Sequence, residues 1–90
     1  MKQVVDVQIE SLDHLKKECS SGGIDCYMVL KGGLISRRFI SYNGKGWYVQ
    51  LGVDDSETEY DDDEHLEQDS GLVRAINEGI LRGYVLREKQ

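Results

Sequence analysis

Proline is absent from this sequence, and cysteine, histidine and tryptophan are scarce. Without proline, the turns must be built from the ten glycines and from asparagine or aspartate, which adopt tight-turn backbone conformations. The longest strictly apolar run, residues 27–30, is far shorter than the roughly 20 residues of a membrane-spanning helix, and the N-terminus lacks the apolar core of a signal peptide. These absences predict a cytoplasmic protein that makes no membrane contact.

The chain is too short for a second hydrophobic core. It has 90 residues, of which 39% are hydrophobic and 31% charged, a composition typical of folded soluble domains. We therefore predict a single domain over residues 1–90 that folds alone with modest stability.

The two cysteines, Cys19 and Cys26, are too few for a scaffold held together by disulfides. Reduced structural thiols are the favoured interpretation, with a disulfide or a metal site as alternatives. A zinc site would need His14, Cys19, Cys26 and His65 to converge, and no closely spaced pair of ligands anchors either half. The sequence therefore predicts no metal and no cofactor.

Two segments have the apolar spacing of amphipathic helices. Residues 12–19 follow Ser11, a residue type that commonly caps a helix N-terminus. Residues 71–78 follow Ser70, which we interpret as the second N-cap, and Gly79 supplies the left-handed residue that often ends a helix. We expect these two segments to be the main helices.

Runs of β-forming residues predict an antiparallel sheet. Glycine and asparagine between the runs favour tight hairpin turns, so a central three-stranded meander is expected over residues 24–30, 34–42 and 47–53. Residues 3–9 suit a short strand or an extended lead-in, and a final strand is expected at 80–86. The prediction is an α+β fold with a sheet of four or five strands and both main helices on one face. An edge strand such as 80–86 could pair with its copy, which leaves a homodimer open.

Acidic residues are concentrated in residues 54–69, DDSETEYDDDEHLEQD, which hold ten of the seventeen acids and no lysine or arginine. The other positions hold seven acids against eleven bases, so a mildly basic body carries an acidic segment. Residues 61–68 can form a short helix. The segment does not match a calcium-binding loop that starts at Asp54. Glu59 stands where the loop requires glycine, and His65 stands where it requires the final glutamate.

Three interpretations of the acidic segment stay open: a solvated turn with a helix start, a surface that recognises a basic protein by electrostatic steering, or weak adventitious binding of a divalent cation. The second is our leading hypothesis, and it makes the chain a non-enzymatic interaction module. The predicted contacts are Asp54, Asp55, Glu57, Glu59, Asp61, Asp62, Asp63 and Glu64.

Nucleic-acid binding is the alternative, although the net charge of −6 argues against it, since phosphates are bound by clustered lysine and arginine. A local basic and aromatic sheet face could still stack bases, and it would consist of Arg37, Arg38, Tyr42 and Trp47. Ordinary cross-strand pairing of these side chains is the competing interpretation.

No catalytic motif is evident. A pair of carboxylates that acts as acid and base needs burial to separate the two pKa values, and the surroundings of residues 54–69 are too polar to promise it. The glycine pairs lie between strands instead of leading into a helix, so they are not phosphate-binding loops.

The stretch ISRRFISYNGKGWYVQLGVDDSETEYDDDEHLEQDSGLVRAINEGILRGY resembles a class of short uncharacterised proteins of phages and prophages of Gram-positive bacteria. The resemblance covers roughly residues 34–84 and consists of the order of basic, aromatic, DDSE, acidic and AINEGIL segments, not of a reactive motif. This chain departs from the class by its denser acidic run. The resemblance implies a compact α+β domain of phage-related origin and favours binding to a host factor.

Overall fold

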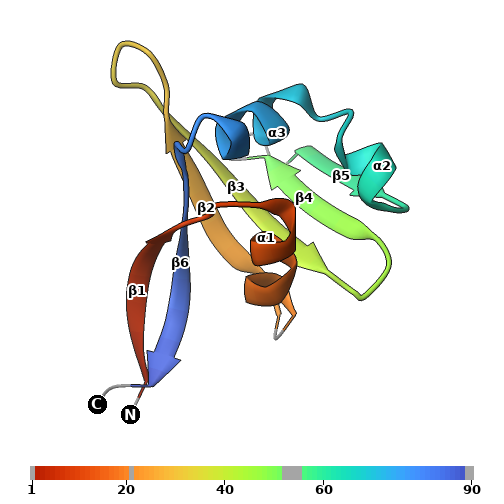
Figure 1. The fold of residues 1–90 in the computed structure, drawn as a ribbon, viewed down its shortest axis with the longest axis horizontal. Coiled ribbons are helices and arrows are strands. Elements are labelled where there is room, and N and C mark those ends of the chain that lie inside the picture. The colour runs from red at the N-terminus through yellow and green to blue at the C-terminus, as the bar shows by residue number, and fades with distance from the viewer. Residues whose placement is uncertain (1, 21, 52–55, 89–90) are drawn as a thin grey trace.

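The computed structural model describes residues 2–20, 22–51 and 56–88 (Figure 1). Its strands are β1 (Lys2–Gln8), β2 (Ile24–Val29), β3 (Ile35–Tyr42), β4 (Trp47–Leu51), β5 (Ser56–Tyr60) and β6 (Leu81–Glu88). Its helices are α1 (Leu12–Cys19), α2 (Asp63–Leu66) and α3 (Ser70–Asn77). The predicted α+β class is confirmed, but the described residues contain six strands and three helices, more than the sequence suggested.

The six strands form one antiparallel sheet in the order β1-β6-β2-β3-β4-β5. The predicted meander is present as β2, β3 and β4, and β5 extends it. The expectation that residues 80–86 form an edge strand is wrong, because β6 pairs with β1 on one side and with β2 on the other. The edges of the sheet are β1 and β5.

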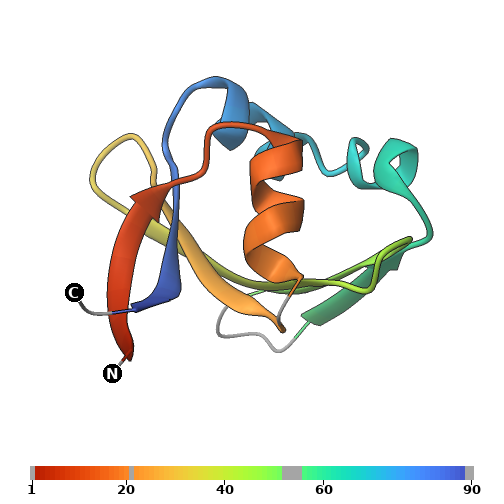
Figure 2. The same cartoon turned by 60° about the horizontal axis from the view of Figure 1, so that its bottom comes forward.

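The helices lie on one face of the sheet, as Figure 2 shows most clearly. The hydrophobic core fills the space between them and the strands, and its fully buried aliphatic side chains are Ile9, Leu15, Ile40, Leu66, Leu72, Leu81 and Val49. The opposite face carries no helix from the described residues, and we call it the helix-free face. Side chains alternate along each strand between the core and this face.

Of the two helix N-caps predicted from the sequence, one is confirmed and one is wrong. Ser11 caps α1 as predicted, because its side chain accepts a hydrogen bond from the His14 backbone N–H at 3.0 Å. The N-cap of α3 is Asp69 and not Ser70: the Asp69 carboxylate accepts from the Leu72 N–H at 3.1 Å, and Ser70 is already helical. A carboxylate is the stronger acceptor at the positive end of a helix.

Strand β5 lies inside the acidic segment, for which no strand was predicted. Thr58 lies opposite the buried Val49, and Tyr60 lies opposite the buried Trp47. These two side chains face the core, and Tyr60 packs against it. Glu57 and Glu59 alternate with them and are exposed on the helix-free face. A strand with two core-facing residues is therefore enough to present carboxylates at the sheet edge.

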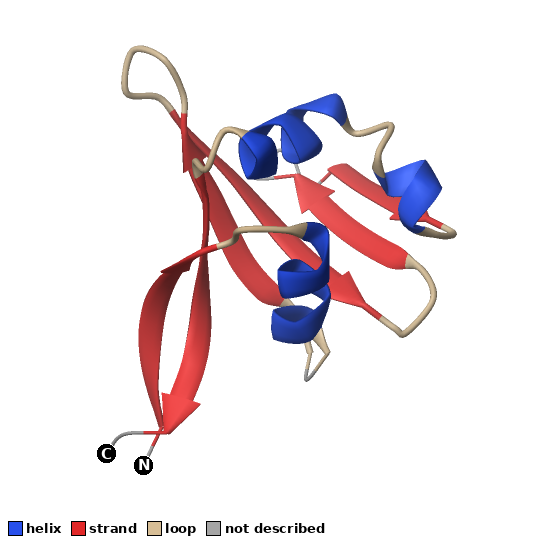
Figure 3. Cartoon of the chain, in the orientation of Figure 1, coloured by secondary structure: helices blue, strands red, loops and turns tan. Residues whose placement is uncertain are grey.

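Strands β1 and β6 continue beyond the rest of the sheet as a two-stranded ribbon (Figure 3). In the described register, β2 pairs with β6 only from Leu81 to Tyr84, whereas β1 pairs with β6 as far as Glu88. Arg87 ties this ribbon to α1 by a bidentate contact with the Glu18 carboxylate.

Candidate functional site

Four exposed carboxylates follow one another along β5 and the turn after it. Glu57 and Glu59 project from β5, Asp61 lies in the following turn, and Glu64 lies on α2. We call Glu57, Glu59, Asp61 and Glu64 the acidic edge. Because β5 is the last strand of the sheet, this surface borders a strand that pairs only with β4 among the described residues.

Asp62 and Asp63, also predicted as partner contacts, have intramolecular partners. The Asp62 carboxylate caps α2 by accepting from the His65 backbone N–H at 2.8 Å, and it contacts His65 Nδ1 at 2.7 Å. Hydrogen bonding from His65 holds the pKa of Asp62 below its usual value, and Asp62 raises the pKa of His65 in return. Asp62 therefore builds the turn that carries Asp61 and Glu64.

Asp63 connects three elements. Its carboxylate accepts from Trp47 Nε1 at 2.9 Å and forms an ion pair with Lys16 of α1. The Lys16 ammonium, followed by the Trp47 N–H, lowers the pKa of Asp63. This carboxylate already has a cation of its own, so it positions α2 against α1 and β4. The remaining predicted contacts, Asp54 and Asp55, lie outside the described residues.

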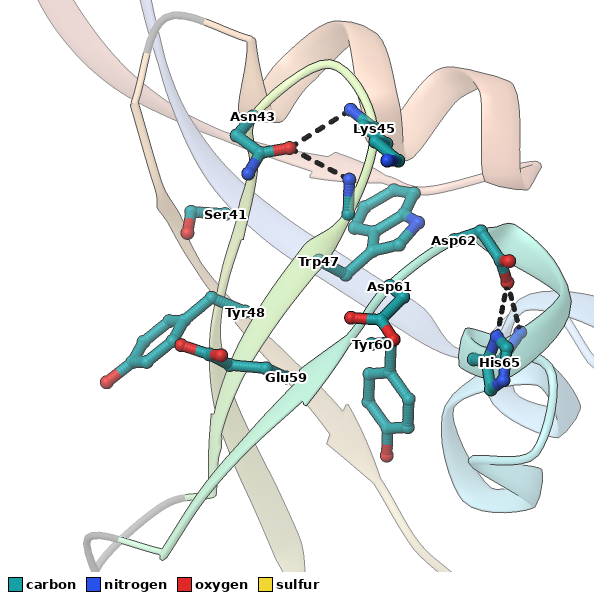
Figure 4. A pocket seen from close by; sticks show the side chains of 11 residues that line it. Ser41, Asn43, Lys45, Trp47, Tyr48, Glu59, Tyr60, Asp61, Asp62 and His65 are labelled. Carbon is teal, nitrogen blue, oxygen red and sulfur yellow. Dashed lines mark hydrogen bonds and ion pairs between the residues drawn. The ribbon is translucent and has the colours of Figure 1, made fainter.

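A hollow opens beside the acidic edge at the turn between β3 and β4 (Figure 4). Tyr48 and Glu59, which are opposite each other in the β4–β5 register, line it together with Asp61 and Lys45. Gly46 lets the turn approach β5 closely, because a Cβ there would lie 2.8 Å from the Tyr60 carbonyl oxygen. The hollow thus combines an aromatic wall with carboxylates.

The four residues of the nucleic-acid alternative do not share an open face. Trp47 is only 2% exposed, and Tyr42 packs on it with ring centroids 4.5 Å apart. Arg38 lies on the helix-covered face, where its Nη1 donates to Ser36 Oγ at 2.7 Å. Arg37 is exposed on the helix-free face. The structure therefore does not assemble the predicted base-stacking surface.

An ion pair between the buried Glu18 of α1 and Arg87 of β6 was not predicted from the sequence. Glu18 is 8% exposed, and its carboxylate contacts both Arg87 and, at 3.3 Å, His14 Nε2. Arg87 lowers the pKa of Glu18 below its usual value, which keeps this carboxylate ionised near neutral pH. The helical spacing could have indicated its burial, because Glu18 comes three residues after Leu15 and so lies on the side of α1 that faces the sheet. Because Arg87 neutralises it, Glu18 links α1 to β6.

Cys19 and Cys26 are buried free thiols, and Cys19 Sγ donates to the Ile40 carbonyl at 3.4 Å. Burial raises the pKa of each to about 12. Since the thiolate is the reactive form, neither cysteine should be alkylated by iodoacetamide at about pH 8 in the folded protein, while both should react in urea. Intact-mass spectrometry measures this, and alkylation of the folded protein would contradict it.

Across the described ranges, no three histidine, cysteine or acidic side chains are grouped as metal ligands. In the same residues, no helix has the length and apolarity needed to cross a bilayer.

No protein-family model matches the chain, and no curated protein and no solved structure is significantly similar to it. The resemblance to phage proteins therefore stays a prediction.

Proposed function

We propose that this chain is a protein-interaction module whose acidic edge binds a basic, extended segment of another protein. The observation that carries the proposal is the exposure of Glu57 and Glu59 on the same face of an edge strand, continued by Asp61 and Glu64. Asp62 and Asp63 have partners within the fold, whereas these four carboxylates project into solvent. A crowded negative surface of this kind attracts and orients a basic partner.

The edge position favours strand addition as the binding mode. A partner strand lying along β5 would form backbone hydrogen bonds and place every second side chain on the helix-free face. Glu57 and Glu59 are two residues apart, a spacing of about 7 Å along a strand, which matches alternate lysines or arginines of a partner strand. A basic side chain in the neighbouring hollow would meet the carboxylates of Glu59 and Asp61 and the ring of Tyr48.

Following the phage resemblance, the partner would be a host protein whose basic segment is masked when it binds. Capture from host lysate, followed by mass spectrometry, would identify the partner once binding to a defined peptide is established.

The proposal predicts binding to a labelled peptide that alternates lysine and threonine. Replacing three acids, by Glu57→Gln, Glu59→Gln and Asp61→Asn, should weaken binding about ten-fold, because three rim ion pairs are worth about 0.5 kcal/mol each. Fluorescence anisotropy measures the affinity. Binding should also weaken as salt rises, since about 0.1 M salt screens exposed charges beyond about 10 Å.

The matched control removes three exposed acids elsewhere, by Glu10→Gln, Asp13→Asn and Glu78→Gln. Both variants raise the formal net charge of −6 by the same amount. The control should bind as the native chain does. An equal loss in both variants would mean that only net charge matters, and unchanged binding by the first variant would end the proposal. A peptide with the same composition but consecutive lysines should bind more weakly if a strand is added.

A further inference from the structure

The opposite edge of the sheet has a different character. Strand β1 exposes Val4, and its cross-strand partner Leu86 on β6 is exposed on the same face, at 66% and 61% respectively. Both lie on the helix-free face, in the part of the β1–β6 ribbon that does not pair with β2. A seven-residue edge strand that carries an exposed apolar pair is a template for pairing with another strand.

We propose that two copies of this chain form a symmetric dimer by antiparallel pairing of their β1 strands, centred on Val4. In this register, Val4 of one copy lies opposite Val4 of the second copy, with a Leu86 outside each. The two exposed apolar pairs thereby become one continuous row across the junction. The sheet of six strands becomes one of twelve.

The charges of β1 complement themselves in the same register. Lys2 of each copy lies opposite Asp6 of the other, so two ion pairs flank the apolar row. The Asp6 carboxylate is already held in place, because it accepts from Arg82 Nε at 2.7 Å and from Tyr27 Oη at 2.5 Å. Arg82 already pairs with Asp6, so Lys2 of the second copy adds another cation to a fixed carboxylate, and this exposed pair sets the register more than it adds affinity.

Neighbouring registers lack this match. Centring the pair on Val5 places Val4 opposite Asp6, and centring it on Asp6 places the two Asp6 carboxylates opposite each other. The other edge strand is also unsuitable, since self-pairing of β5 would gather Glu57 and Glu59 of both copies on one face. The β1 edge is therefore the surface that fits a second copy, and the dimer leaves an acidic edge at each far end of the sheet.

Sedimentation velocity over a range of concentrations tests the dimer. The native chain should move from its monomer mass of 10.2 kDa toward twice that mass as concentration rises. Val4→Lys should weaken dimerisation about ten-fold or more, because it places two ammonium groups opposite each other. The control Ile35→Lys replaces another exposed apolar residue of the same face, far from β1, and should leave dimerisation unchanged.

The register has its own test. Paired residues of antiparallel strands have Cα atoms about 4.5–5.5 Å apart, a separation that a disulfide can span. Val4→Cys should therefore form a covalent dimer under mild oxidation, and Gln8→Cys should not. A native chain that stays monomeric, a dimer that survives Val4→Lys, or one that Ile35→Lys disrupts equally would overturn the proposal. Circular dichroism of each variant shows whether it is folded.

Discussion

Replacement of Trp47 by alanine is expected to lower the free energy of unfolding by about 3–5 kcal/mol. Trp47 is buried between the sheet and the helices, its ring packs on Tyr42, and its Nε1 donates to Asp63. A domain of this size has about 5–13 kcal/mol in total, so the variant should be partly unfolded even without denaturant. Because Trp47 is the only tryptophan, urea unfolding should be followed by far-ultraviolet circular dichroism.

Trp47→Phe separates packing from hydrogen bonding. Phenylalanine keeps an aromatic ring against Tyr42 but cannot donate to the Asp63 carboxylate, so a loss of about 1.5–3 kcal/mol is expected. A phenylalanine variant as unstable as the alanine variant would show that the contact with Asp63 dominates. An alanine variant as stable as the native chain would contradict the role of Trp47 in the core.

The second large effect concerns Glu18 and Arg87. Arg87→Ala should lower the free energy of unfolding by about 1–3 kcal/mol at neutral pH, because it leaves the buried Glu18 carboxylate with His14 alone. This loss of stability is smaller than the loss expected for a fully buried ion pair, because the Arg87 side chain is 46% exposed. Thermal and urea unfolding of the two proteins measure the difference.

The difference should depend on pH in a defined direction. Arg87 lowers the pKa of folded Glu18, so its stabilising contribution is fully present above the unfolded pKa of about 4.3 and disappears as pH falls through the lower folded value. Native chain and Arg87→Ala should therefore differ most above about pH 5 and converge in acid. Asp6, Asp62 and Asp63 also have lowered pKa values, but they are unchanged in the variant and cancel in the comparison.

Glu18→Gln provides the matched control, because it keeps the shape of the side chain and removes its charge. In a double-mutant cycle with Arg87→Ala, the two losses should not add, since both remove the same interaction. Additive losses, or a difference between native chain and Arg87→Ala that is as large at about pH 3 as at about pH 7, would contradict the pairing.

The helices and strands that depend on neighbouring residues in the sequence were predicted correctly. Ser11 and the apolar positions Leu15 and Cys19 define α1, and the alternation of Trp47 with Val49 defines the buried face of β4. Gly79, with a φ of +73°, ends α3 as expected. Strand order was out of reach, because nothing local in residues 80–86 indicates insertion between β1 and β2.

The candidate site was predictable in part. The density of acids in the sequence predicted exposed carboxylates, as found for Glu57, Glu59, Asp61 and Glu64. The ion pair between Asp63 and Lys16 could not be predicted, because the two residues are far apart in the chain. Arg37 and Arg38 lie on opposite faces of the sheet, because successive side chains of a strand point to opposite sides. The same period placed Trp47 in the core and so removed it from an open stacking surface.

The insertion of β6 between β1 and β2 also sets the order in which the fold can assemble. Hairpins β2–β3, β3–β4 and β4–β5 join neighbouring segments, whereas β1 and β6 join residues near Lys2 to residues near Glu88. Closing a long loop costs more entropy than closing a short one, so the meander should form early and the outer pair late. While β6 is unpaired, one side of β2 is an open strand edge, and open edges are where strands of different chains pair and aggregate.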